Sequence, residues 1–519
     1  MKKTMLKALC LITAALMLAA VIPLAALAKT APETRDIWDG SVAEGFAGGS
    51  GTAEDPYLIS SGAELAYLAE QVNAGESYEG CLFELTDDIY LNDTEGWEDW
   101  SAENPPANMW TPIGWAELCT DGVAEWHEMK WFKGSFNGGG HAIYGLFTSP
   151  ESEAKVTSGL FGCMYEAAVS GISVLESCVI GNYTCAGIVA WGADVSVYDS
   201  SFQGMIESGS SCGGIFGHIE AADDCISNCV SVGVFEGTEA VGGIAGNFSG
   251  TGISITNCKA NCLVYSEGEA GGIAGELSGR ADYCMAAGQV IGEVTAGGLI
   301  GSLWNSVRHS YNLASVMGLN AGGIAGSAND AGISDSYNCG SVEGIENTGG
   351  IFGMGYQASL RQCYNVGTVT GGEATGALFG FDYEGSSNCQ NCFCLEGCTE
   401  GQHIGAFVLT EEQMTDASNY EEFDFENVWT MDGNSDYPYA ELIDNPHITI
   451  DDEEPVLPGD VDDDGEVTVA DALLALRASM GLVELNDEQQ AAANVDGDEE
   501  ITVADALLIL RASMGLLEL

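Results

Sequence analysis

The central part of the chain alternates short apolar runs with glycine-rich phrases. Between residues 155 and 395, runs such as 230–234 and 364–369 alternate apolar and polar positions and are rich in β-branched side chains. The helical period that would place apolar residues three and four apart is absent from this stretch. The pattern therefore predicts short β-strands separated by turns.

The glycine phrase, typically Gly-Gly-Ile-x-Gly, returns at a regular spacing. A period of about 27 residues is typical of stacked coils. A leucine-rich repeat would show a leucine ladder ending in Asn, and a propeller needs about 40 residues per blade. The spacing therefore favours a mainly β fold, a parallel β-helix or closely related β-solenoid with one coil per repeat. The second glycine of the phrase, or its substitute, stands at Gly159, Gly187, Gly214, Gly243, Gly272, Gly298, Gly323, Gly350 and Ala377.

Small or sulfur side chains recur fourteen positions before most of these glycines, at Ser200, Cys229, Cys258, Cys284, Ser336 and Cys363. We expect them to form a ladder that points into the solenoid, as buried thiols rather than disulfides or metal ligands. A denser group, Cys389, Cys392, Cys394 and Cys398, has ligand-like spacing but falls where the last coil closes. Metal binding and simple burial both remain open for this group.

Both ends of a solenoid need a cover, because an open strand edge promotes aggregation. Residues 63–73 place apolar side chains on one helical face and predict a short helix that covers the amino end. Residues 409–439 lack the glycine phrase and contain the aromatic side chains Phe423, Phe425, Trp429 and Tyr437. We expect them to belong to a carboxyl cap.

The first residues predict export. Lys2, Lys3 and Lys7 precede the apolar run 8–27, and small residues at the end of that run suit cleavage after Ala28. A membrane anchor is the less favoured alternative, and no later stretch reaches the roughly 20 apolar residues of a membrane span. We therefore expect a secreted, extracellular chain.

The remaining boundaries follow from the changes in pattern. Residues 29–150 are expected to form the amino cap and opening coils, 151–400 the repeats and 401–443 the carboxyl cap. Residues 444–458 are acidic, contain proline and suit an extended linker to a second domain at 459–519. The formal charge of -64, from 14 basic and 78 acidic residues, disfavours nucleic acid as a partner.

The glycine phrase and its spacing resemble the GLUG repeat of secreted bacterial proteins, over residues 40–442. The resemblance implies a right-handed β-helix displayed outside the cell, and no particular reaction. Some GLUG proteins are immunoglobulin A metallopeptidases, whose zinc site needs two histidines one helical turn apart. Here His127 and Glu128 are followed by Met129, Lys130 and Trp131, so the second ligand is missing.

The carboxyl-terminal part of the chain contains two acidic loops of twelve positions. Calcium prefers six to eight oxygen ligands, which such a loop can wrap from positions 1, 3, 5, 7, 9 and 12. The sequence therefore predicts two Ca²⁺ sites. The first loop supplies Asp460, Asp462, Asp464, Glu466, Thr468 and Asp471, with Gly465 at the sharp turn; the second supplies Asn494, Asp496, Asp498, Glu500, Thr502 and Asp505.

The two loops differ at one turn position. Glu499 stands in the second loop where Gly465 stands in the first. A non-glycine residue at positive φ costs on the order of 1 kcal/mol. We expect the second loop to bind calcium more weakly.

Each loop runs into a helix, and the segments 467–482 and 501–516 are identical at all but two positions. Two such loop and helix units, with Asp at position 12, resemble a type I dockerin over residues 459–519. The resemblance implies docking onto a cohesin domain of a scaffold protein, as in a cellulosome. It assigns the cohesin-facing positions to Val469, Ala470, Leu476, Arg477 and Gly481 in the first copy, and to Val503, Ala504, Leu510, Arg511 and Gly515 in the second. Because the two faces are nearly identical, either helix is expected to dock.

The function of the solenoid is less defined by the sequence. Six of the ten tryptophans lie between residues 97 and 131, and Trp97 and Trp100 are candidates for carbohydrate binding, with hydrophobic packing as the alternative. The leading hypothesis is a non-catalytic module for carbohydrate binding or adhesion to plant polysaccharide. The rival is a polysaccharide hydrolase or lyase with its site on the β-helix face, for which no catalytic residue is evident. Candidate lyase bases in the coils are Lys155, Lys259, Arg280, Arg308 and Arg361.

Overall fold

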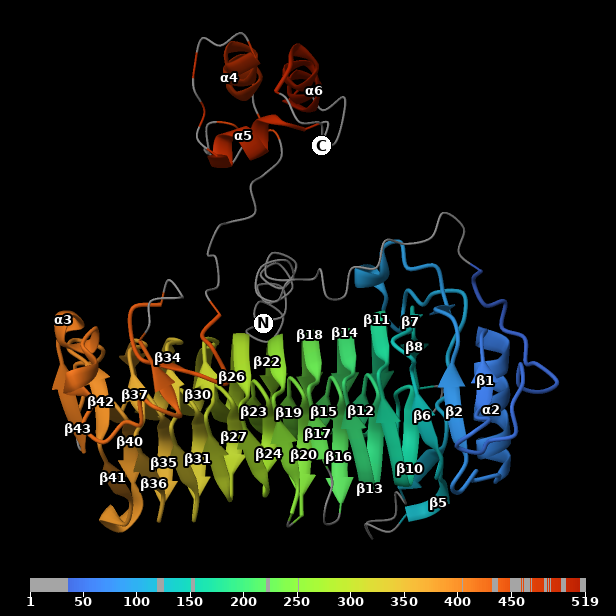
Figure 1. Ribbon diagram of the computed structural model, residues 1–519, viewed down its shortest axis with the longest axis horizontal. Helices are drawn as coiled ribbons and strands as arrows, with labels where there is room; N and C mark the ends of the chain where they lie inside the picture. The colour runs from blue at the N-terminus through green and yellow to red at the C-terminus, as the bar shows by residue number, and fades with distance from the viewer. Residues whose placement is uncertain are drawn as a thin grey trace. The chain divides into compact units, whose positions relative to one another are not determined.

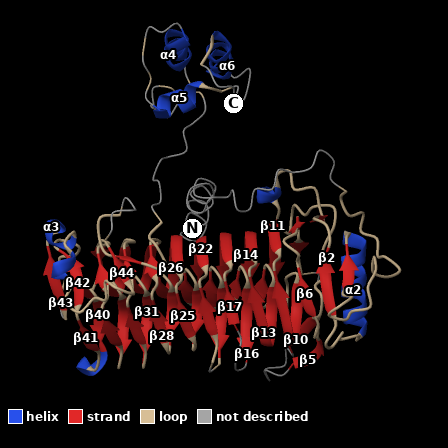
Figure 2. Cartoon of the chain, viewed as in Figure 1, coloured by secondary structure: helices blue, strands red, loops and turns tan. Residues whose placement is uncertain are grey.

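The computed structural model describes most of the chain up to residue 448 and parts of the segment that follows. The described ranges are 36–118, 126–150, 155–220, 225–250, 252–403, 405–431 and 437–448, followed by 459, 461, 467, 469–479, 483, 485, 487–495 and 501–513. The chain divides into two compact units, Met1–Thr449 and Ile450–Leu519. Figure 1 traces both units and Figure 2 distinguishes their helices and strands.

The first unit is a parallel β-solenoid, as predicted. Equivalent strands of successive coils pair in parallel, so that Phe216 pairs with Ala245 and Ala245 with Ala274, while Ile300 pairs with Ala325. The steps between these partners reproduce the period of the glycine phrase. The prediction of coils of about 27 residues is therefore confirmed.

The strands of successive coils stack side by side in two sets, each of which extends along the solenoid (Figure 2). Among the described residues, the first set contains β1 (Tyr57–Ile59), β2 (Leu82–Leu85), β6 (Ser135–Asn137), β10 (Phe161–Ser170), β13 (Val189–Tyr198), β16 (Phe216–Glu220), β17 (Cys225–Ser227), β20 (Ala245–Ser249), β21 (Ser254–Thr256), β24 (Ala274–Leu277), β25 (Arg280–Asp282), β27 (Ile300–Leu303), β28 (Ser306–Arg308), β31 (Ala325–Asn329), β32 (Gly332–Ser334), β35 (Phe352–Tyr356), β36 (Ser359–Arg361), β40 (Phe379–Asp382) and β41 (Asn388–Gln390). The second contains β3 (Ile89–Tyr90), β7 (Ala142–Tyr144), β8 (Phe147–Thr148), β11 (Ser173–Gly181), β12 (Cys185–Ala186), β14 (Ser201–Ser208), β15 (Cys212–Gly213), β18 (Val230–Gly237), β19 (Ala240–Gly242), β22 (Lys259–Ser266), β23 (Glu269–Gly271), β26 (Met285–Gly297), β29 (Tyr311–Asn312), β30 (Ser315–Gly322), β33 (Tyr337–Asn338), β34 (Val342–Gly349), β37 (Tyr364–Asn365), β38 (Val369–Thr370), β39 (Ala374–Gly376), β42 (Cys392–Leu395) and β43 (Ala406–Leu409).

The predicted ladder of small and sulfur side chains points into the solenoid. All six of its predicted members are buried. Each hydroxyl or thiol donates to the carbonyl oxygen two positions earlier; the Cys363 Sγ to Arg361 O distance is 3.3 Å. The residue before each ladder position has a left-handed backbone, such as Tyr283 with φ of 57° before Cys284. The ladder side chains thus satisfy carbonyl groups where every coil turns a corner.

A second ladder is made of asparagines. Asn312, Asn338 and Asn365 are fully buried, and the Nδ2 of each of the first two donates to the Oδ1 of the next at 2.8 Å. Each Nδ2 also donates to a carbonyl oxygen two positions further along the chain. These amides link three coils through paired polar groups, which a buried amide requires.

The amino end of the solenoid is covered by a helix, as predicted (Figure 1). Helix α2 (Gly62–Ala74) begins after Ser61, whose hydroxyl accepts a hydrogen bond from the Glu64 amide, and it buries Leu65, Leu68 and Val72. An insertion between β3 and β6 carries all six of the clustered tryptophans. It contains the 3₁₀ turn η2 (Trp97–Asp99) and the antiparallel strands β4 (Trp115–Leu118) and β5 (Trp126–Lys130). Strand β9 (Lys155–Val156), which follows β8 in the chain, pairs with the other edge of β4.

The carboxyl end has two parts. Strand β43, helix α3 (Glu411–Met414) and the 3₁₀ turn η4 (Ala417–Asn419) follow the last coil, where Tyr420 and Phe423 pack against Phe393 with ring centroids 5.3 and 5.5 Å away. The predicted 409–439 segment therefore does cover the last coil in part. A further 3₁₀ turn, η3 (Tyr383–Gly385), lies between β40 and β41.

Residues 437–448, here called the strap, run back along the side of the solenoid. They lie on a stack of three buried tyrosines, Tyr311, Tyr337 and Tyr364, whose ring centroids are 4.9 and 4.8 Å apart. The Tyr337 hydroxyl is 3.1 Å from His447 Nδ1 and the Tyr364 hydroxyl is 3.0 Å from that of Tyr437. Short strands β44 (Trp429–Thr430) and β45 (Glu441–Leu442) pair beside the stack. The sequence did not predict this lateral contact.

The second unit contains three helices among its described residues: α4 (Val469–Ser479), α5 (Asp487–Ala493) and α6 (Val503–Ser513). Helices α4 and α6 occupy equivalent positions in the two copies and follow the two acidic loops, as the repeated sequence predicts. Their common core consists of small and apolar side chains: Val461, Ala472, Ala475, Ala492, Ala493, Ala506 and Ile509.

Candidate functional site

The predicted calcium ligands lie partly within the described residues. Asp471 and Asp505, at position 12 of the two loops, are both fully buried. Asn494 and Thr502 are half-buried at the ends of the second loop. The other predicted ligands lie outside the described residues: Asp460, Asp462, Asp464, Glu466, Thr468, Asp496, Asp498 and Glu500.

The two position-12 carboxylates make the same contact. Asp471 Oδ1 accepts the backbone N–H of Val461 at 2.8 Å, and Asp505 Oδ1 accepts that of Val495 at 3.2 Å. In each copy the acceptor lies ten positions after the donor, so the start of the loop is folded back onto its last carboxylate. The sequence repeat is therefore also a repeat in space.

Asp505 is fixed at the start of helix α6. Its Oδ2 accepts the backbone N–H of Thr502 at 2.7 Å and the Thr502 hydroxyl at 3.0 Å. A carboxylate in this position is favoured by the positive end of the helix. Buried carboxylate oxygens at a loop end are the donors that Ca²⁺ prefers, so the described ligands fit a calcium loop.

The comparison with family models decides what this unit is. Residues 458–512 match the family model described as the dockerin type I domain. The chain carries a dockerin type I domain at its carboxyl end. Such domains generally bind calcium, and their presence implies a cohesin partner. The comparison with family models does not identify a GLUG repeat in the coils.

The predicted cohesin face of the dockerin is described only in part. Arg477 on α4 and Arg511 on α6 are exposed at equivalent positions, whereas Leu476 packs partly against the dockerin core. The side chains of five further members lie outside the described set, although their positions are on the two helices: Val469, Ala470, Val503, Ala504 and Leu510. Gly481 and Gly515 lie outside the described residues altogether. The two exposed arginines are thus related by the same repeat as the loops.

No curated protein matches the chain. A solved structure described as a "putative immunoglobulin A1 protease" from Bacteroides ovatus is similar, with 17% sequence identity and a TM-score of 0.39. The similarity covers 77% of this chain and 95% of that one. At this level it carries no information about function. None of the described helices combines the length and apolarity that a membrane crossing requires.

The tryptophans proposed to bind carbohydrate are buried. Trp97 is 6% and Trp100 is 9% exposed, and both pack with Phe147, Cys178 and Ile180. A sugar ring could reach neither indole face without displacing this packing. The alternative given for these residues, hydrophobic packing of the first coils, agrees with their burial.

The four clustered cysteines form two pairs whose thiols interact, Cys389 with Cys392 and Cys394 with Cys398. Cys392 continues the inward ladder after Cys363, and Cys394 pairs with Asn365 in the asparagine column. Cys394 Sγ lies 3.5 Å from His403 Nδ1, while Cys389 Sγ donates to Gly405 O. Within the described residues, no group of three or more His, Cys, Asp or Glu side chains could hold a metal ion.

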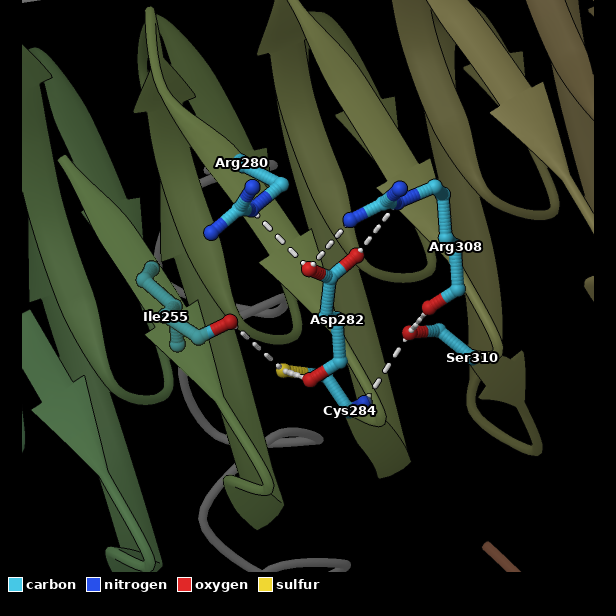
Figure 3. A network of polar contacts seen from close by, with 6 residues as sticks. All are labelled: Ile255, Arg280, Asp282, Cys284, Arg308 and Ser310. Carbon is cyan, nitrogen blue, oxygen red and sulfur yellow. Dashed lines mark hydrogen bonds and ion pairs between the residues drawn. The ribbon is translucent and has the colours of Figure 1, made fainter. Parts of the chain in front are cut away.

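Sequence reasoning missed an ion-pair network on the outer face of the solenoid (Figure 3). Asp282 is held between Arg280 of its own strand and Arg308 of the next coil. Arg308 donates to it through Nε and Nη2, both at 2.9 Å, and Arg280 through Nε at 2.9 Å. The Asp282 side chain is 8% exposed, and its hydrogen bonds raise the pKa of Arg308. The signal was present in the spacing, because Asp282 and Arg308 are separated by one coil and pair directly in the strand register.

Proposed function

We propose that this chain is a secreted component of a cellulosome-type complex. Its dockerin binds a cohesin of a scaffold protein in the presence of calcium, and its solenoid is displayed for carbohydrate binding or adhesion. The observation that supports this most directly is the repeated contact of Asp471 and Asp505 in a domain that matches dockerin type I.

Two equivalent docking faces are part of the proposal. The first comprises Val469, Ala470, Leu476, Arg477 and Gly481, and the second Val503, Ala504, Leu510, Arg511 and Gly515. Because α4 and α6 repeat almost position for position, the cohesin engages either helix, with the dockerin turned by half a turn between the two modes. Asp substitution of both Val469 and Ala470 is therefore expected to leave affinity nearly unchanged, whereas adding the same changes at Val503 and Ala504 abolishes binding.

Binding of the full chain to recombinant type I cohesins tests the proposal. We expect binding in Ca²⁺ and none after chelation with EDTA, because the loops supply charged oxygens that only a bound cation brings together. Asp471→Asn combined with Asp505→Asn should abolish binding, and Asp93→Asn, an exposed carboxylate of the solenoid, serves as the matched control. Binding that survives chelation would contradict the proposal.

A second candidate function is hydrolysis of a polysaccharide by the solenoid. Burial and the nearby carboxylate of Glu276 raise the pKa of Glu269, which suits a general acid. In the next coil, Glu269 pairs with Thr295 and Glu276 pairs with Ser302. Thr295 Oγ1 and Ser302 Oγ lie 3.4 Å apart, so the strand positions that carry the two carboxylates face each other. Release of reducing ends from glucan or xylan, lost in Glu269→Gln, would favour this function; no release would exclude it.

A further inference from the structure

Three aromatic side chains are exposed on the outer surface of the later coils. Trp304 and Tyr383 are each 50% exposed and Tyr356 is 38% exposed. Of the tryptophans whose side chains the structure describes, Trp304 alone is exposed, and the others are buried or half-buried. The rings of Tyr356 and Tyr383 contact each other, with centroids 5.8 Å apart. We call these three residues the aromatic row.

The strand register places the aromatic row at one turn of successive coils. Leu303 pairs with Ala328, and Asn329 pairs with Tyr356. Trp304 follows Leu303 as Asn329 follows Ala328. Trp304 therefore stands at the position in its coil that Asn329 and Tyr356 occupy in the next two coils. Gly355 pairs with Asp382, which places Tyr383 at the same position in the following coil. At the spacing of paired strands, the row extends about 14 Å along the solenoid.

A column of small outward-facing residues, here called the floor, lies beside the row. The outward positions that follow the turn are Ser306, Gly332 and Ser359, which pair with one another across three coils. None of them carries a large side chain, so the floor is low between the aromatic row and the far ends of strands β28 and β36. Those far ends carry Arg308 and Arg361.

Arg308 and Arg361 supply donors at the far side of the floor, whereas Arg280 pairs with Ser306 and so lies beside the floor in the preceding coil. Arg308 is held in place by two hydrogen bonds to Asp282, and Arg280 by one, yet their side chains remain 42% and 51% exposed (Figure 3). Arg361 is exposed and forms no ion pair with any residue that the structure describes. Exposed guanidinium groups can donate to hydroxyl oxygens of a ligand, and those held by Asp282 do so from a fixed position.

We propose that the aromatic row, the floor and the arginines together form a binding face for a neutral polysaccharide. Aromatic faces stack on the apolar faces of pyranose rings, and the serines and arginines hydrogen-bond to the hydroxyl groups at the ring edges. The formal charge of -64 opposes the approach of an acidic polymer. This inference rests on the proposed function of the solenoid in displaying a carbohydrate-binding surface. It assigns the contact with carbohydrate to this face instead of to the buried Trp97 and Trp100.

Binding of the full chain in Ca²⁺ to cellulose, xylan and soluble β-glucan tests the proposal, with polygalacturonate as the acidic comparison. Trp304→Ala should weaken binding to the neutral polymer about tenfold, because it removes one stacking surface. Phe407→Ala is the matched control, since Phe407 is 53% exposed on β43 and lies outside the row. Arg361→Gln should weaken binding about threefold and Lys259→Gln, a cation on β22, should not.

Thermal unfolding of each variant checks that the solenoid is intact, and none of the substituted side chains is buried. Equal affinity of Trp304→Ala and the wild type, equal losses in Trp304→Ala and Phe407→Ala, or a preference for polygalacturonate would overturn the proposal. Absence of binding to every polymer would overturn it as well. Cohesin binding measured on the same samples keeps these outcomes separate from a failure of the docking function.

Discussion

Acid is expected to release the strap from the tyrosine stack, because His447 is half-buried there as a neutral ring. Its ring lies 3.7 Å from that of Tyr437 and 5.5 Å from that of Tyr311, and Nδ1 is 3.1 Å from the Tyr337 hydroxyl. Burial lowers the pKa of His447 from 6.5 to about 4. The carboxylate of Glu441 accepts the backbone N–H of His447 at 3.2 Å.

The direction of the effect follows from the two pKa values. A histidine whose folded pKa lies below its unfolded pKa binds fewer protons in the folded state, so its contribution is complete above pH 6.5 and is lost as the pH falls toward 4. A shift of this size is worth up to about 3 kcal/mol, at about 1.36 kcal/mol per pKa unit. At pH 4.5 the population of the open strap should be up to about 60-fold greater than at pH 7.

Hydrogen exchange of the strap amides measures this population directly. The amide of Ile448 donates to the Tyr311 hydroxyl at 3.1 Å and that of Ile443 to Val428 O at 2.9 Å, so both exchange only when the strap opens. Their protection, relative to an unstructured peptide at the same pH, should fall between pH 7 and 4.5.

The variant His447→Gln keeps a polar side chain but cannot titrate, so its protection should change far less over this range. His403→Gln, at an exposed position, should behave as the wild type. Equal losses of protection in the wild type and His447→Gln would refute the reasoning, because the acid effect would then arise from other groups.

Three further predictions concern the ladders and the dockerin. Asn338→Ala should lower the free energy of unfolding in urea by about 2–4 kcal/mol, because it leaves two buried amides short of a partner, whereas the exposed Asn305→Ala should change it by less than about 0.5 kcal/mol. Cys284 should react far more slowly with a thiol reagent at pH 8 in the native chain than after unfolding, because burial raises its pKa to about 12; equal rates would contradict its burial. Glu499→Gly should tighten the weaker of two calcium sites resolved by calorimetry, and no change would refute the proposed strain at that turn.

The repeating part of the fold could be predicted because each coil repeats the same requirement. Every corner needs a small donor for its carbonyl group, so Cys229 and Cys258 recur at a spacing that the sequence shows directly. The strap could not be predicted in this way. The Tyr364 hydroxyl donates to the carbonyl oxygen of Ala440, which is far away along the chain, and such a contact leaves no period in the sequence.

The proposed binding face was hidden for a different reason. Its members share a face only once the register of each coil is known, and the repeats vary in length because turns of different length separate the strands. The spacing of Trp304 and Tyr356 in the sequence therefore does not by itself place them at the same turn. Tryptophan clustering in the sequence instead drew attention to Trp97 and Trp100, which the insertion buries.

The two units use repetition in opposite ways, and the ligand-binding faces proposed for them differ accordingly. In the solenoid the inward positions repeat while the outward ones differ from coil to coil, as Arg308, Ser334 and Arg361 do at one paired position. Inward repetition satisfies packing and backbone hydrogen bonds, so specificity for a ligand has to come from outward positions that depart from the repeat. In the dockerin the loops and the exposed Arg477 and Arg511 repeat as well. A surface residue has no packing reason to be duplicated, and its repetition is what the two docking faces proposed above require.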